Sequence, residues 1–201
     1  MEKLVLLEAR KCLVDGASRC VEYNLGTEAG MPCGGTVEVF MEVLNVKPRV
    51  YVFGGGHVGQ AVCRTLAGTP FAVHVIDGRE EWIGADRFPQ DTVRHQSPPD
   101  EFIEKVEWSS SQTYVVILTH DSQLDEKIVA SAIAHPSRYI GMIGSRTKWQ
   151  QIQKNLVAGG ARPDDLARVR CPLGIDGIRG KAPQEIAISV AAELLKVFYE
   201  E

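Results

Sequence analysis

A glycine-rich turn, Gly54-Gly55-Gly56-His57-Val58-Gly59, contains the residues of this sequence best suited to hold a phosphate. It has the spacing G-x-G-x-x-G and directly follows the apolar run 50–53. In such a turn Gly54 permits the tight bend, Gly56 lets the backbone approach a pyrophosphate, and Gly59 allows close packing of helix on strand. The N–H groups at the start of the helix would face the anion. We therefore expect a dinucleotide or another phosphate ligand here, the alternative being a turn that only packs the fold.

Asp77 and His57 are the side chains most closely tied to this turn. Asp77 lies roughly 20 residues further on, at the end of the next apolar run, where an acidic residue accepts hydrogen bonds from ribose hydroxyls. A carboxylate there would repel a 2′-phosphate, although Arg79 close by could moderate the repulsion. His57 could contact a ligand phosphate or face solvent, and we assign it no proton-transfer role.

His120 and Asp121 follow the apolar run 113–118, at the edge where open α/β sheets bind their ligands. The two side chains could orient one another or take a metal, and Asp125 would face the same way one helical turn later. Alternatively, Asp121 caps the helix that follows. Both interpretations are compatible with the sequence.

Ser145 and Arg146 follow Gly144 at the end of the apolar run 139–143. A flexible turn, a hydroxyl and a fixed cation are suited to an anion. A helix cap and a surface arginine are the alternative interpretation of the same residues.

The sequence contains five cysteines, an odd number without a CxxC pair, which argues against both a disulfide framework and a zinc ribbon. Cys33, followed by Gly34, is the thiol to which we assign ligand binding, because flanking glycines leave the sulfur accessible. Cys12 and Cys63 lie in apolar helical patterns and are expected to be buried. Cys171, in a glycine-rich loop, is either a second contact or a packing residue.

Alternating strand and helix patterns must position these groups. From residue 49 onward, apolar runs without clean polar alternation are followed by helical patterns, which predicts an α/β fold with a Rossmann-like parallel sheet flanked by helices. The expected strands are 50–53, 71–76, 92–94, 113–118 and 139–143, and the expected helices are 57–67, 99–106, 124–134, 147–157 and 183–199.

The first 48 residues have a different pattern. A helix is expected over 3–14, a strand over 19–24, a glycine-rich loop over 26–35 and a second strand over 36–44. The sequence thus predicts a small N-terminal α+β appendage, 1–48, that carries the Cys33 loop, and a Rossmann-like domain, 49–201.

Composition excludes several classes of protein. The 201 residues are 44% hydrophobic, and 22 basic and 26 acidic side chains stand in mixed order with a net charge of −4, so we expect no nucleic-acid partner. We expect no membrane segment, because no run approaches the roughly 18 apolar residues of a span, and we expect a cytoplasmic protein.

Five segments in order resemble the XdhC/CoxI family of xanthine dehydrogenase accessory proteins. They are 33–39, 53–59, 118–121 with Asp125, 139–148, and 171–177 with 181–187. The resemblance implies a chaperone that binds the molybdenum cofactor, molybdopterin, and shelters it while a cysteine desulfurase-type sulfurtransferase installs its sulfido ligand. It also implies delivery to an apo-molybdenum hydroxylase, with Cys33 as a possible molybdenum contact, since soft thiolates suit that metal.

Familiar members of this family have a longer N-terminal segment with its own Ser-Gly-Gly-Cys loop. We expect that part of the cofactor site to be missing, to come from another chain, or to come from a second copy, and the last alternative makes a homodimer possible. Two alternative functions also fit the sequence: an NAD(P)-dependent oxidoreductase with His120 as general acid or base, and a regulatory domain that binds a nucleotide without turnover.

Overall fold

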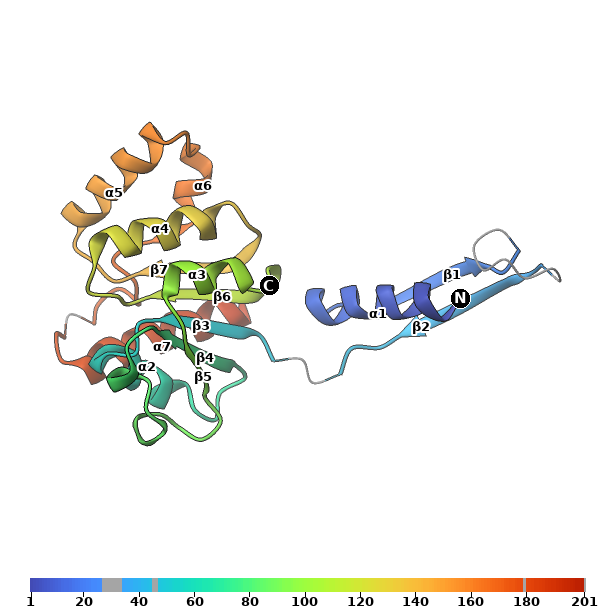
Figure 1. Ribbon diagram of the computed structural model, residues 1–201, viewed down its shortest axis with the longest axis horizontal. Coiled ribbons are helices and arrows are strands. Elements are labelled where there is room, and N and C mark those ends of the chain that lie inside the picture. Colours follow the sequence, from blue (N-terminus) through green and yellow to red (C-terminus); the bar gives the residue numbers. More distant parts are fainter. Residues whose placement is uncertain (27–33, 45–46, 179, 201) are drawn as a thin grey trace. The chain divides into compact units, whose positions relative to one another are not determined.

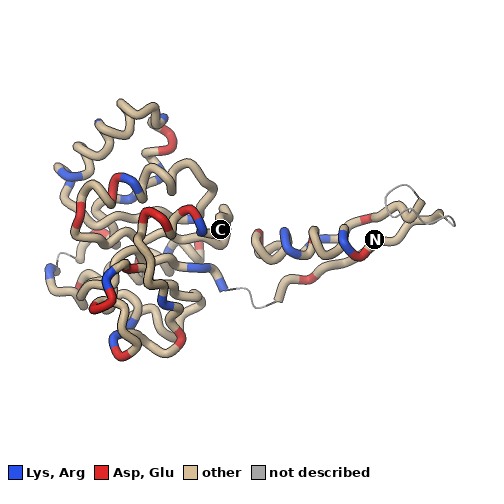
Figure 2. The backbone as a smooth tube through the Cα atoms, in the orientation of Figure 1, with Lys and Arg blue, Asp and Glu red and all other residues tan. Residues whose placement is uncertain are grey.

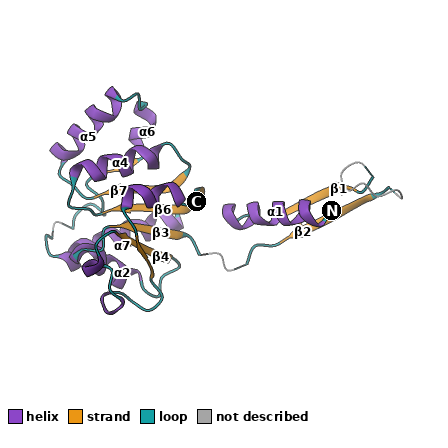
Figure 3. Ribbon diagram, viewed as in Figure 1, coloured by secondary structure: helices purple, strands orange, loops and turns teal. Residues whose placement is uncertain are grey.

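A computed structural model describes the chain except for residues 27–33, 45–46, 179 and 201. The chain divides into two compact units, Met1–Val46 and Lys47–Glu201, close to the division expected at residue 48. The larger unit has a six-stranded parallel sheet flanked by helices, and the smaller has a helix and a two-stranded antiparallel sheet (Figures 1 and 3). The predicted fold class is therefore confirmed. Figure 2 shows acidic and basic residues interspersed in both units.

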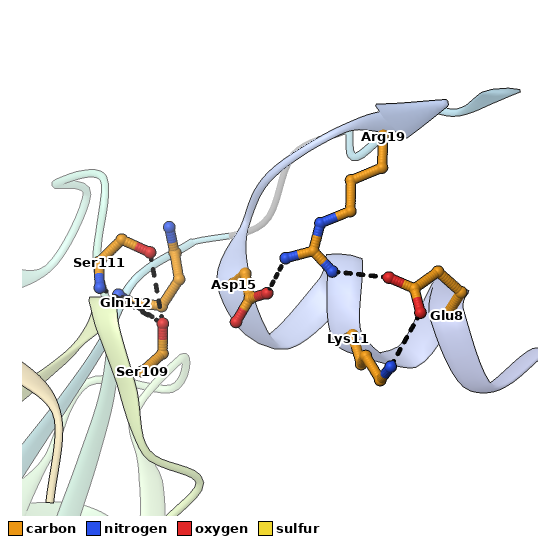
Figure 4. A network of polar contacts seen from close by, with 7 residues as sticks. All are labelled: Glu8, Lys11, Asp15, Arg19, Ser109, Ser111 and Gln112. Carbon is orange, nitrogen blue, oxygen red and sulfur yellow. Dashed lines mark hydrogen bonds and ion pairs between the residues drawn. The ribbon is translucent and has the colours of Figure 1, made fainter. Parts of the chain in front are cut away.

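The N-terminal unit consists of α1 (Glu2–Asp15) and the hairpin of β1 (Arg19–Asn24) and β2 (Thr36–Met41). The Arg19 guanidinium joins helix and hairpin, because it donates to Glu8 at 2.9 Å and also to Asp15 (Figure 4). Hydrogen bonds from Lys11 and Arg19 lower the pKa of the Glu8 carboxyl. The expected helix and both strands are confirmed, and Cys33 lies outside the described residues.

The sheet of the larger unit has the strand order β5-β4-β3-β6-β7-β8. Its strands are β3 (Arg49–Phe53), β4 (Ala72–Asp77), β5 (Val93–Gln96), β6 (Ser109–Ile117), β7 (Ser137–Met142) and β8 (Val169–Arg170). The order reverses between β3 and β6, where Phe53 pairs with Ile117 at the carboxyl ends of the two strands. Open α/β sheets bind their ligands outside the strand ends at such a switch point.

Helices cover both faces of the sheet (Figure 1). They are α2 (His57–Leu66), α3 (Pro99–Phe102), α4 (Ser122–Ile133), α5 (Arg146–Ala158), α6 (Pro163–Ala167) and α7 (Pro183–Tyr199). Val50 and Val52 of β3 pack in a core with α2 and α7, whereas Tyr51 and Phe53 pack in a second core with α3, α4 and α5. Because β3 is buried on both faces, its sequence is a continuous apolar run.

Three elements differ from those expected. The helix predicted over 99–106 ends at Phe102 and continues as a 3-10 turn, Ile103–Lys105. The short elements α6 and β8 were not predicted, since five and two residues are too few to show a periodic pattern. Among the described residues, no helix is both long and apolar enough to cross a membrane.

A partly buried histidine pair joins β4 and β5 beside the second core. Nδ1 of His74 lies 3.0 Å from Nε2 of His95, with the ring of Phe102 packed against His95 and that of Tyr51 against His74. One ring must accept this hydrogen bond and therefore must be neutral. Burial, together with the neighbouring His95 and Arg49, lowers the pKa of His74 to about 4.

We predict that the stability of the fold decreases with acidification below about pH 6.5, the ordinary pKa of histidine. Between that pH and about 4 the unfolded chain binds a proton at His74 that the folded chain does not. The free energy of unfolding therefore decreases as the pH is lowered. Urea unfolding at about pH 7.5 and about pH 5 measures this fall, and His74→Gln should reduce it. His120→Gln, at an exposed histidine, is the matched control, and equal pH dependence in all three proteins would contradict the prediction.

Candidate functional site

The glycine turn and the segment after β6 meet at the switch point of the sheet. The backbone N–H of Leu118 donates to the Phe53 carbonyl oxygen at 2.8 Å. Gly54 has a φ of 118°, and a Cβ there would lie 2.8 Å from the Leu118 carbonyl oxygen. The structure thus brings the turn expected to bind phosphate beside the segment that carries His120.

The three glycines of the motif are required for different physical reasons. A Cβ on Gly59 would lie 2.0 Å from the Gly54 carbonyl oxygen, so only glycine lets α2 start this close to β3. A Cβ on Gly56 would meet no atom within 4 Å. Gly56 is also the N-cap of α2, so no capping side chain occupies the first N–H groups of this helix. This backbone fits an approaching phosphate.

The Asp77 carboxylate, which the sequence predicted would accept hydrogen bonds from a ribose, accepts them from Gly55 and Arg79 of the same chain. Its side chain is buried, and Oδ2 accepts hydrogen bonds from the Gly55 N–H and Arg79 Nη2, both at 2.8 Å. Oδ1 accepts from the Arg79 N–H at 3.0 Å and from Nε at 2.9 Å. Burial by itself would raise the pKa of Asp77, but the bonds from Arg79 and Gly55 hold it below its ordinary value. The carboxylate is therefore ionised, and each oxygen already accepts two hydrogen bonds.

Trp82 covers one side of the glycine turn, a feature that was not predicted from the sequence. The exposed His57 lies edge-on to the Trp82 ring, with 5.0 Å between centroids. The guanidinium carbons of Arg79 and Arg87 lie 5.4 and 5.5 Å from the centroid of the Trp82 ring. A large aromatic residue among charged ones, shortly after Asp77, was the available signal.

Asp121 caps α4, as the alternative interpretation of this residue stated. Its Oδ1 accepts from the Gln123 N–H at 2.8 Å and from the Leu124 N–H at 3.3 Å, and these bonds lower its pKa. His120 is exposed. Within the described ranges no group of three or more histidine, cysteine or acidic side chains is arranged to hold a metal ion.

Asp125 points into the protein and forms an ion pair that was not predicted from the sequence. It is fully buried, and it accepts hydrogen bonds from Thr119 Oγ1 at 2.6 Å and from Lys148 Nζ at 2.5 Å. Burial raises the pKa of Asp125, while Lys148 and Thr119 oppose the rise. The pair joins α4 to α5, and Thr119 connects it to the segment after β6. Burial also raises the pKa of the neighbouring Cys171 to about 11, so that this cysteine is a protonated thiol at neutral pH.

Ser145 and Arg146 begin α5 beside a cavity. Ser145 Oγ accepts from the Lys148 N–H at 3.1 Å and thereby caps the helix, whereas Arg146 is exposed and lines the cavity. The cavity measures about 720 Å³ and lies between the turn after β7, the loop after β8 and the first turns of α7. Its walls are largely apolar, with Asp176 and Glu185 as acidic groups.

The loop after β8 is fixed to the body of the domain, so one wall of this cavity is rigid. Glu193 of α7 is buried, and it accepts hydrogen bonds from the Gly174 N–H at 2.7 Å and from the Tyr139 hydroxyl at 2.5 Å. The Ile175 N–H donates to the Ser189 carbonyl oxygen at 3.2 Å. The glycine spacing in 171–177 signalled a loop, but it did not reveal the buried acid that holds it.

The remaining predicted site residues belong to the N-terminal unit. Gly34 has a φ of 61° in the backbone before β2, and Cys33 lies outside the described residues. The roles expected for these two residues stay predictions. The larger unit by itself brings together Gly54, Gly56 and Asp77 in one group, while Ser145 and Arg146 line a separate region near β7.

Six parallel strands in this order, with a glycine turn at the switch point, define a Rossmann-type domain. Residues 50–194 match the family model described as the XdhC Rossmann domain. The chain therefore belongs to the XdhC family, as its sequence motifs predicted.

Individual relatives agree with this assignment. The chain is 30% identical over 202 residues to Escherichia coli (strain K12) "Uncharacterized protein YqeB", covering 98% of this chain and 37% of that protein. It is 27% identical over 161 residues to a probable xanthine dehydrogenase component of Bacillus subtilis (strain 168), covering 80% of this chain and 46% of the relative. A crystal structure described as a xanthine dehydrogenase from Bacillus halodurans superimposes with a TM-score of 0.65 at 26% identity, covering 85% of this chain and 46% of that one. The chain thus spans less than half the length of each relative.

We predict that Gly59→Ala lowers the free energy of unfolding by at least about 3 kcal/mol, because the new methyl group collides with a backbone oxygen that cannot move away. Gly56→Ala is the matched control in the same turn and should cost about 1 kcal/mol or less, since its methyl group enters open space. Urea unfolding measured on both variants tests the contrast. Similar losses from the two substitutions would contradict it.

We also predict that Lys148→Met destabilises the domain by about 3 kcal/mol, because a fully buried carboxylate then loses its cation. The double variant Asp125→Leu/Lys148→Met should recover most of this loss, since two apolar groups can replace a buried pair. Lys154→Met, at an exposed lysine of the same helix, is the control. A double variant as unstable as Lys148→Met would show that the loss does not come from the unpaired charge.

Proposed function

We propose that this protein is an accessory factor for xanthine dehydrogenase-type molybdenum hydroxylases, which binds molybdopterin, protects it during sulfuration and delivers it to the apo-enzyme. The single observation that supports this most strongly is the match to the XdhC Rossmann domain over residues 50–194. Two relatives carry xanthine dehydrogenase in their names, which agrees with such a client. A cysteine desulfurase-type sulfurtransferase is the second partner in this proposal, and the cytoplasm is the place where the three would meet.

The described residues suit a phosphorylated pterin as cargo. The backbone at Gly56 and the first N–H groups of α2 would bind its phosphate. The cavity beside Arg146 has about 720 Å³, within the usual range for small-molecule sites, and its apolar walls suit a flat heterocycle. Asp176 and Glu185 could accept hydrogen bonds from ring N–H and amino groups. These residues bind and orient the cargo, and none of them needs to transfer a proton.

The N-terminal unit would supply the contact to the metal. Cys33, next to Gly34, is the thiol that we propose as the soft ligand for molybdenum. A second copy of the chain, or the additional length present in the relatives, would complete the shelter around the metal.

We predict that the protein co-expressed with the enzymes of molybdopterin synthesis copurifies with a pterin and with molybdenum. Fluorescence of the oxidised pterin and elemental analysis measure the two separately. Cys33→Ala should lose most of the molybdenum, and Arg146→Ala should lower the pterin content, because each removes one proposed contact. Cys20→Ala, at an exposed cysteine of β1, is the matched control for the thiol and should retain both.

A wild-type protein that carries neither pterin nor molybdenum would overturn this proposal. Equal loss of molybdenum from Cys33→Ala and Cys20→Ala would overturn the role of Cys33 alone, because loss at either thiol would then reflect a general effect of cysteine removal.

A further inference from the structure

A Rossmann-type domain receives a dinucleotide through two features of its first βαβ unit. The glycine turn binds the pyrophosphate, and an acidic residue at the end of the second strand accepts the ribose hydroxyls. In this chain the second strand of that unit is β4, and the acidic residue is Asp77. NAD(P) binding would therefore require Asp77 to be accessible and the adjoining part of the turn to be open.

Asp77 does not meet the first requirement. Its side chain is only 5% exposed, and its two oxygens accept four hydrogen bonds from Arg79 and Gly55. Two of them come from the Arg79 guanidinium in the bidentate arrangement that makes arginine–carboxylate pairs strong. A ribose could reach the carboxylate only by displacing this guanidinium, which would leave a buried charge without its partner.

The second requirement, an open glycine turn beside Asp77, is not met either, because a neighbouring segment covers that part of the turn. A Cβ on Gly55 would lie 2.7 Å from the carbonyl oxygen of Trp82, so the 3-10 turn Glu80–Trp82 is packed directly onto the first half of the motif. Gly56, one residue further on, has no atom within 4 Å of the same test position. The turn is therefore open at the position of the phosphate and closed on the side of Asp77.

Aromatic and cationic groups hold this cover in place. Arg79 lies over the Trp82 ring while it binds Asp77, and Arg87 lies 5.5 Å from the centroid of the same ring. His57, from the first turn of α2, contacts Trp82 edge-on. The strand end, the 3-10 turn and the helix thus form one connected group around Arg79.

We propose that Arg79, bound to Asp77 and packed on Trp82, occupies the place where the ribose of a dinucleotide would bind, so that the glycine turn accepts a terminal phosphate and rejects NAD(P). The acceptance of a terminal phosphate rests on the proposed function, whereas the rejection of dinucleotides rests on the contacts of Asp77, Arg79 and Trp82 alone. Arg79 is accordingly the specificity-determining residue of the turn.

Calorimetric titration of the full chain with NAD⁺ tests this assignment. The wild-type protein should give no measurable binding of NAD⁺. Arg79→Met keeps an unbranched apolar stem to pack on Trp82 but removes the guanidinium, which frees Asp77. Its Kd for NAD⁺ should be at least about tenfold lower than the lower bound on Kd that the titration of the wild type sets.

Three further variants make the result specific. Arg87→Met removes the other cation from the Trp82 ring but leaves Asp77 occupied, so it should behave like the wild type. Asp77→Asn/Arg79→Met should lose the binding gained in the single variant, because the ribose acceptor is weakened. Arg79→Lys, which cannot bind both carboxylate oxygens, replaces Arg79→Met if circular dichroism shows that the latter is unfolded, and it should show a smaller gain.

The outcomes separate this proposal from the proposed function. Micromolar binding of NAD⁺ to the wild type, lost in Asp77→Asn, would overturn it, as would an Arg79→Met or Arg79→Lys variant that is folded and gains nothing. Absence of copurified pterin would overturn the carrier function and the terminal phosphate with it, but a gain of NAD⁺ binding in Arg79→Met would still establish the role of Arg79.

Discussion

The close approach of Gly59 to the carbonyl oxygen of Gly54 is the constraint on which the rest of the site depends. It lets α2 begin immediately beside the end of β3, at the point where the strand order reverses. The backbone that results leaves the start of this ten-residue helix without a side-chain cap, and no atom lies within 4 Å of a Cβ position on Gly56. The proposed phosphate site rests on this start of α2, and the proposed rejection of dinucleotides rests on the neighbouring Asp77, Arg79 and Trp82.

The buried acidic side chains of this domain are each paired with another side chain and are therefore not free to bind a ligand. Asp77 is held by Arg79, Asp125 by Lys148 and Glu193 by Tyr139, and all three carboxyl groups are buried. Buried carboxylates need such partners, because an unpaired charge in the interior is costly. Pairing also makes them poor proton donors and acceptors for a substrate, since each is already committed to a partner. Among the described residues near this edge, backbone N–H groups, the exposed Arg146 and a largely apolar cavity remain accessible to a ligand.

The sequence allowed the fold and the location of the site to be predicted, but not the state of its side chains. Apolar runs with strand length identified five of the six strands of the parallel sheet, and the glycine spacing located the turn, because these features depend on local pattern. β8 escaped notice because two residues carry no periodicity. The pairing of Asp77 with Arg79 was considered only as a moderating charge, and Lys148 was missed, because such contacts depend on which side chains the tertiary fold brings together. Asp121 shows the same limit, since a helix cap and a ligand contact require the same residue type at the same place.

Buried polar contacts anchor the second half of the domain. The Glu193 network fixes the loop after β8 to α7, and the Asp125–Lys148 pair joins α4 to α5, so the loop and the turn before α5 that line the cavity are both anchored by buried acidic side chains. A preformed cavity loses little conformational entropy when it takes up a rigid heterocycle. In the proposed function Arg146 would then contact an anionic ligand without any movement of the backbone, while the backbone at Gly56 would bind a phosphate by the same principle. Neither of these contacts would require the transfer of a proton, which is why the proposal assigns the two regions to holding a reactive molecule rather than to converting it.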